Sequence, residues 1–113
     1  MRKVTERPCF QGEIMFRRVS AIPTNAKKVT PEHGRHILAH SETGHHHVIE
    51  SRAADRFIDE TNAFIAWIEV MEPTELKHLR EFDTHESWMF EPGVYEVVTQ
   101  REATPEGWRR AAD

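Results

Sequence analysis

The feature that most constrains the fold of this chain is its excess of β-branched residues. Valine and isoleucine together number 15, whereas leucine occurs only three times. Branching at Cβ restricts the rotamers of a side chain in a helix and suits the pleated surface of a sheet. Polar, turn-forming residues also recur at short intervals, which is typical of short strands joined by turns. We therefore predict an all-β fold, either a small barrel or a sandwich.

The length and composition narrow the class further. The 113 residues fit one domain, and we predict a polar N-terminal arm over 1–12 and a single β domain over 13–113. The lone cysteine, Cys9, excludes an internal disulfide. No apolar run reaches the roughly 20 residues of a membrane span. The formal net charge of −4 does not favour a nucleic-acid partner. We expect a cytoplasmic protein without a membrane or nucleic-acid partner.

Alternating apolar residues predict the positions of the strands. The most apolar segment, 63–71, carries apolar side chains on both faces, which favours a central strand with Trp67 in the core. Segment 53–59 fits either a strand or a short helical turn. Thr104 followed by Pro105 is typical of a helix start and predicts a short C-terminal helical turn within 105–112. The other strands are expected over 13–19, 35–40, 45–51, 74–80, 88–91 and 94–101.

The histidines are concentrated in one predicted hairpin. Six of the eight lie between positions 33 and 47. With 41–44 as the loop, His40 faces His45, Leu38 faces His47, and side chains two residues apart share a face of the sheet. The hairpin then presents four imidazoles on one face, together with Leu38 and Ile49: His36, His40, His45 and His47.

These imidazoles are close enough to share a metal ion. Opposed strand residues bring their Cβ atoms to about 4.5–5.5 Å, and a zinc–nitrogen bond is about 2.0–2.1 Å long. We predict His40, His45, His47 and His85 as metal ligands, with zinc, iron or nickel as the metal. Whether His36 or His78 joins them stays open. The alternatives are solvated or structural histidines, and a cluster that responds to pH.

Three segments of the sequence carry a resemblance: 11–18 (Gln-Gly-Glu-Ile-Met-Phe-Arg-Arg), 37–47 (Ile-Leu-Ala-His-Ser-Glu-Thr-Gly-His-His-His) and 92–102 (Pro-Gly-Val-Tyr-Glu-Val-Val-Thr-Gln-Arg-Glu). In this order they resemble an uncharacterised family of small bacterial and phage-associated proteins. This resemblance implies a shared fold but no particular activity. A more limited resemblance is to the cupin superfamily, through 44–50 and the Pro-Gly turn at 92–93. It implies a cupin-like fold with a histidine metal site. No histidine follows the Pro-Gly turn, so His85 would have to be the fourth ligand.

Two functions follow from these observations. The first is a small β protein that binds a divalent transition metal through the histidine-rich hairpin, with an open position for water or a small molecule. The second is a non-catalytic interaction or accessory protein of a phage or mobile element, with structural or pH-responsive histidines. The sequence identifies no catalytic residue and leaves open whether the protein is an enzyme. Exposed sheet edges lead us to expect a homodimer.

Overall fold

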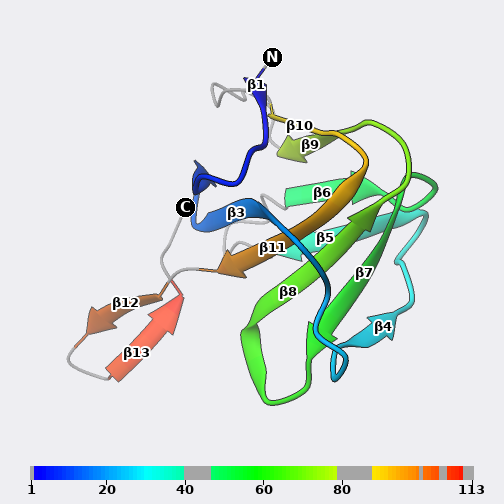
Figure 1. Ribbon diagram of the computed structural model, residues 1–113. Coiled ribbons are helices and arrows are strands. Elements are labelled where there is room, and N and C mark those ends of the chain that lie inside the picture. Colours follow the sequence, from blue (N-terminus) through cyan, green and yellow to red (C-terminus); the bar gives the residue numbers. More distant parts are fainter. Residues whose placement is uncertain (1, 40–46, 79–87, 100, 105–106, 111–113) are drawn as a thin grey trace.

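The computed structural model of the protein describes residues 2–39, 47–78, 88–99, 101–104 and 107–110. These residues form strands, turns and loops, with no helix among them (Figure 1). They therefore include no helix long and apolar enough to cross a membrane. The strands form two separate main sheets, each with two edges. The predicted all-β fold is confirmed, as a sandwich rather than a closed barrel.

The strand order places distant parts of the sequence side by side. One sheet has the order β1-β10-β9-β6-β5, and the other has the order β2-β3-β11-β8-β7-β4. A further pair, β12 and β13, forms a small antiparallel sheet of its own. The bounds in the first sheet are β1 (Arg2–Lys3), β10 (Trp88–Phe90), β9 (Thr74–His78), β6 (His47–Glu50) and β5 (Arg35–Ala39). Those in the others are β2 (Cys9–Gln11), β3 (Ile14–Val19), β11 (Gly93–Thr99), β8 (Asn62–Val70), β7 (Ala54–Asp59), β4 (Lys27–Val29), β12 (Arg101–Thr104) and β13 (Gly107–Arg110).

Aromatic rings join the two main sheets. Phe16 on β3 is fully buried, and its ring centroid lies 5.5 Å from that of Trp88 and 5.5 Å from that of Phe90, both on β10. Phe90 in turn packs edge to face on Tyr95 of β11, at 4.8 Å. Such pairs add to the stabilisation that comes from burying the rings alone. This cluster is the centre of the core.

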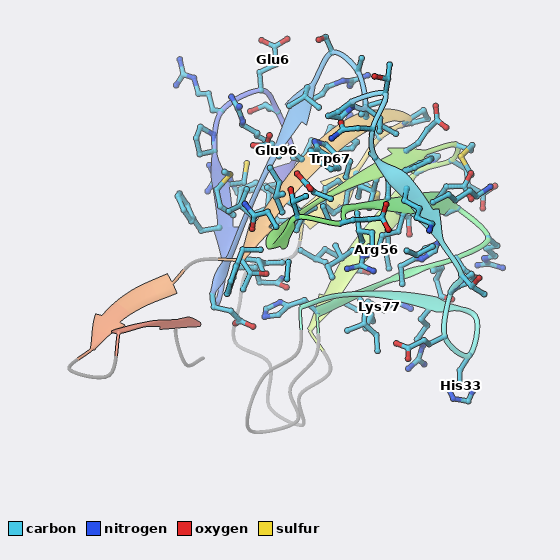
Figure 2. All side chains as sticks on the ribbon, turned by 90° about the horizontal axis from the view of Figure 1, so that it is seen from below. Glu6, His33, Arg56, Trp67, Lys77 and Glu96 are labelled. Atoms are coloured by element: carbon cyan, nitrogen blue, oxygen red, sulfur yellow. The ribbon has the colours of Figure 1, made fainter. Side chains whose placement is uncertain are left out.

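The central-strand prediction is confirmed. Strand β8 lies between β11 and β7, with hydrogen-bonded neighbours on both sides. Trp67 on β8 is 6% exposed and stands opposite Glu96 of β11 (Figure 2). The segment that fitted either a strand or a helical turn is strand β7.

The N-terminal segment, predicted to be a polar arm, is built into both sheets. Strand β1 pairs with β10 in parallel, whereas β2 pairs with β3. Val4, Cys9 and Gln11 are buried. The β2–β3 turn contains Gly12 with φ of 56°, a left-handed conformation that glycine adopts without the steric cost of a Cβ atom. Tertiary pairing therefore orders a segment whose own hydrophobicity is low.

The predicted C-terminal helical turn is wrong. Gly107–Arg110 forms strand β13, which pairs with β12 in a register that sets Thr104 opposite Gly107. Proline and glycine are also frequent in turns. In this chain the preceding strand offers hydrogen-bond partners to the segment, so a hairpin forms instead of a helix.

Candidate functional site

The candidate site is a buried polar group centred on His47. The His47 side chain, at the start of β6, is fully buried. Its Nδ1 lies 2.8 Å from Oε1 of Gln11, and its Nε2 lies 3.1 Å from Oε2 of Glu13. Gln11 and Glu13 are each only 3% exposed. We call these three residues the His47 group.

The β2–β3 turn places Gln11 and Glu13 together. Gln11 is the last residue of β2 and Ile14 the first of β3, and the two are register partners. Glu13 lies between Gly12 and Ile14, at the mouth of this turn. The turn belongs to the six-stranded sheet, whereas His47 belongs to the five-stranded one. The His47 group therefore joins the two sheets at one end of the sandwich.

Electrostatics limits the charge states of the His47 group. An ionised carboxylate that is taken out of water loses several kcal/mol or more of solvation unless a cation or several donors compensate it. Glu13 is buried against the Nε2 atom of His47. An ionised Glu13 needs a cation here, either the imidazolium form of His47 or a metal ion bound by both side chains, whereas a protonated Glu13 is neutral and needs neither.

Among the predicted ligands, the structure places His47. His40, His45 and His85 lie outside the described residues. The described residues contain no group of three or more His, Cys, Asp or Glu side chains that could hold a metal ion. In the part of the chain that is described, the candidate ligands are therefore the pair of Glu13 and His47.

The strand ends around His47 show where the histidine-rich segments connect. Strand β5 ends at Ala39 and β6 begins at His47, while β9 ends at His78 and β10 begins at Trp88. These four strands are consecutive neighbours in one sheet, and the register pairs His47 with both Ala39 and His78. Segments 40–46 and 79–87 are thus both attached to the end of the sheet that carries His47.

The predicted hairpin register is partly right. His36 stands opposite Ile49, as predicted. The predicted pairing of Leu38 with His47 is wrong, because a register shift between Ile37 and Ala39 places Ala39 opposite His47. A bulge of this kind adds one residue to one strand and changes every pairing beyond it. It cannot be read from hydrophobic alternation.

His36 has a structural role outside the His47 group. It is 3% exposed, and its Nε2–H donates a hydrogen bond of 2.9 Å to the carbonyl of Ala54 on β7. Burial lowers the pKa of His36 below its ordinary value of 6.5, and the bond to Ala54 offsets this only in part. His36 is therefore a neutral residue that links β5 to β7.

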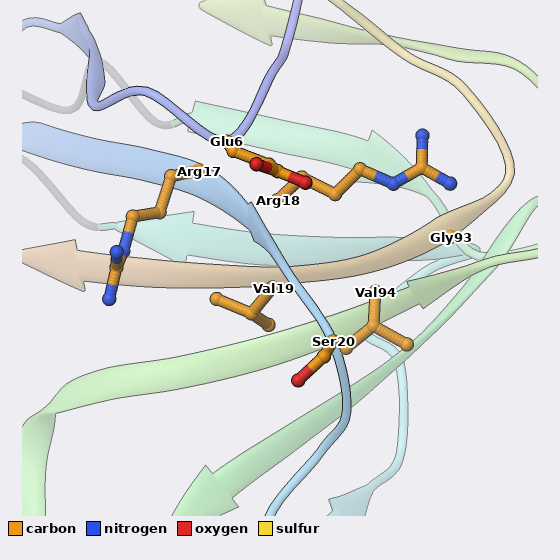
Figure 3. Close-up of a pocket in the computed structure, with 7 residues that line it drawn as sticks. All are labelled: Glu6, Arg17, Arg18, Val19, Ser20, Gly93 and Val94. Carbon is orange, nitrogen blue, oxygen red and sulfur yellow. The ribbon is translucent and has the colours of Figure 1, made fainter.

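A surface pocket of 770 Å³ lies at the other end of β3 and β11. Arg17 and Arg18 point to opposite sides of it (Figure 3). Arg17 pairs with Glu96 at 3.4 Å, and Arg18 donates a 2.8 Å hydrogen bond to the Pro92 carbonyl. Each guanidinium therefore already has an oxygen partner, and the charges are close to balanced because Glu6 also lines the pocket.

Gln11 and Glu13 were not predicted as site residues from the sequence. Both fall at the boundary between the predicted arm and the first strand, where no hydrophobic alternation points inward. The signal that could have found them is the segment 11–18, which carries part of the family resemblance and begins with Gln11, Gly12 and Glu13. Two polar residues that flank a turn glycine can both face a core when the turn closes a hairpin.

Comparisons with known proteins point to one family. No curated protein and no solved structure matches this chain. One family model, described as "Domain of unknown function (DUF8820)", matches residues 10–100 and so covers most of both main sheets and the whole His47 group. The chain belongs to the uncharacterised DUF8820 family.

Proposed function

We propose that this protein binds a divalent transition metal at the end of the sandwich that carries His47. The ligands are His47, Glu13 and histidines of the two attached segments, His40, His45 and His85. The observation that carries this proposal is the buried contact of 3.1 Å between Glu13 Oε2 and His47 Nε2. It places a carboxyl oxygen and an imidazole nitrogen together, at the end of the sheet where the histidine-rich segments connect.

The distance within the pair fits two ligands of one ion. Metal–oxygen and metal–nitrogen bonds of zinc are about 2.0–2.2 Å. Two such bonds at an angle of about 90–109° place their ligand atoms about 2.8–3.6 Å apart. The observed 3.1 Å between Oε2 and Nε2 falls in this range. A carboxylate with several imidazoles suits zinc, iron or nickel.

Gln11 supports the same proposal. A metal-binding imidazole usually donates its second N–H to an oxygen, which fixes the tautomer and the ring orientation. The His47 Nδ1–H donates to Gln11 Oε1 at 2.8 Å, so Nε2 is the nitrogen that is directed toward the ion. Gln11 is then a positioning residue and not a ligand.

Metal analysis of protein purified without a histidine tag tests the proposal. We expect close to one equivalent of a transition metal in the wild-type protein and a large loss in the His47→Gln variant. His33→Asn is the matched control, because His33 is exposed at the periphery of the molecule (Figure 2) and has a φ of 51°, which asparagine tolerates. Absence of metal, with no thermal stabilisation by added zinc or nickel, would rule the proposal out.

A specific observation also favours a second candidate function, a non-catalytic accessory protein with a pH-responsive histidine. Both ring nitrogens of His47 face side-chain oxygens, of Gln11 and Glu13. An imidazolium donates from both nitrogens and would form a buried ion pair with Glu13. A metal-free protein whose stability changes with pH near neutrality, with a pH profile that differs between the wild type and His47→Gln, would support this role. The association with a phage or mobile element stays a prediction.

Other expectations from the sequence stay predictions. They are the homodimer, the small-molecule ligand at the metal, the cupin-like character and the cytoplasmic location. Size measurement in solution tests the first of these directly. We assign no catalytic residue, and an enzymatic role requires turnover that is lost on chelation and restored by the metal.

A further inference from the structure

The segment that crosses between the two sheets forms one wall of a second pocket, of 410 Å³. We call it the N-terminal pocket; its lining includes Arg2, Lys3, Arg7, Phe10 and Trp88. Backbone hydrogen bonds fix this wall on both sides. The Val4 N–H donates to the carbonyl of Met89 in the five-stranded sheet at 3.0 Å, and the Arg18 N–H of β3 donates to the Thr5 carbonyl at 2.7 Å. The backbone of this wall is therefore held in place by hydrogen bonds to both sheets.

The charged residues that line the N-terminal pocket, among those described, are all basic: Arg2, Lys3 and Arg7. The Arg2 guanidinium lies over the ring of Trp88 at 5.0 Å, and Lys3 pairs with Glu91 at 3.3 Å. Arg7 makes no ion pair with any described residue. This local concentration of positive charge occurs on a chain with a net charge of −4.

Two contacts hold the backbone at Arg7. Its N–H donates to Oγ1 of Thr5 at 3.2 Å, and its carbonyl accepts a hydrogen bond from Sγ of Cys9 at 3.3 Å. The Arg7 side chain thus starts from a backbone that two contacts hold in place. Guanidinium groups match phosphate oxygens through two parallel hydrogen bonds.

An exposed aromatic ring lies beside these cations. Phe10 is 52% exposed, which is unusual for a large apolar side chain, and it lines the pocket together with the buried Trp88. Basic side chains next to exposed aromatic rings are the combination that binds nucleotides without sequence preference, since the ring stacks on the base and the cations bind the phosphate. The volume of the pocket is also in the range of small-molecule sites.

We infer that the N-terminal pocket binds a nucleotide, with the phosphate on Arg7 and the base stacked on Phe10. The ligand is a free mononucleotide or one unit of a single strand, since both present the same phosphate and base. The net charge of the whole chain does not favour a nucleic-acid partner. A local cluster of basic side chains can still bind a phosphate group.

Titration of the full chain in EDTA tests this inference independently of the metal proposal. The probes are AMP, a ten-nucleotide deoxythymidine strand and inorganic phosphate. We expect Arg7→Gln to lower the affinities for AMP and for the strand about tenfold. The salt dependence of strand binding should fall by about one phosphate contact. Phe10→Ala should lower the affinities for AMP and for the strand about tenfold. It should leave the affinity for inorganic phosphate unchanged, because only the stacking partner of the base is lost.

Two matched controls test the position of the site. Arg52→Gln removes an exposed arginine elsewhere, and Met71→Ala removes a side chain that is 51% exposed, close to the value for Phe10. Neither should change the affinity. Tighter binding of the strand than of AMP identifies a single strand as the ligand, and equal affinities identify a mononucleotide. Absence of binding at millimolar AMP and strand, or equal losses in the control variants, would overturn the inference.

Discussion

At the scale of single residues, His36 shows how burial sets a charge state. Its ring is buried, and its Nε2–H is bonded to the Ala54 carbonyl. The positive charges of Arg56 and Lys28 lower its pKa further, and the negative charge of Asp55 raises it. The net direction is downward, because burial is the largest cause. The folded protein therefore holds His36 in its neutral form.

This lowered pKa makes stability depend on pH in a defined direction. Because His36 has a lower pKa in the folded than in the unfolded state, the folded protein binds fewer protons. Its contribution to the free energy of unfolding is fully present above about pH 6.5 and is lost as the pH falls below that value. Urea unfolding of the wild type and His36→Gln between pH 8 and pH 5 measures this. The wild type should lose more stability on acidification than the variant, and identical losses would contradict the assignment.

The residues of the candidate site were only partly predictable. His47 could be found because it belongs to a dense group of histidines. Gln11 and Glu13 could not be found in the same way, since their burial depends on the β2–β3 hairpin packing against β6 of the other sheet. A polar residue next to a turn glycine looks solvent-exposed until its tertiary neighbours are known.

At the scale of elements, the alternation of apolar residues predicted the positions of the longer strands well. It predicted poorly which strands pair with each other. Segments such as β3 and β8 carry regular patterns of apolar residues, so their positions could be predicted. Short strands such as β1 and β2 are made by pairing with β10 and β3, and their own residues give little signal. The bulge in β5 and the pairing of β12 with β13 were equally hard to predict, because both depend on which backbone hydrogen-bond partners the fold brings near.

The packing of β3 against β10 predicts a large loss of stability when a ring is removed from this contact. Phe16 is fully buried against the rings of Trp88 and Phe90. Phe16→Ala should therefore lower the free energy of unfolding by about 3–5 kcal/mol, through lost burial and the cavity left between the sheets. Phe10→Ala is the matched control, because Phe10 is 52% exposed. It should cost about 0.5 kcal/mol or less. Denaturant unfolding measures both, and equal costs would show that the ring cluster does not hold the sheets together.

At the scale of the whole molecule, the two proposed sites use different parts of the N-terminal segment. The His47 group lies where the β2–β3 turn meets the start of β6, and the N-terminal pocket is lined by residues of β1, β2 and the chain between them. Both use residues of the N-terminal segment that the sequence presented as a polar arm. The family match begins at residue 10, so it includes Gln11, Glu13 and His47 but not Arg7.

Calorimetry of zinc binding to the metal-free wild type and three variants tests whether Glu13 and His47 bind a metal ion together. Glu13→Gln keeps the shape of the side chain and removes its charge, so the affinity should fall about tenfold or more. His47→Gln should abolish stoichiometric binding, and His33→Asn should bind as the wild type does. Circular dichroism checks that each variant is folded. Equal zinc affinity in the wild type and in folded Glu13→Gln and His47→Gln would contradict the assignment of this buried pair as metal ligands.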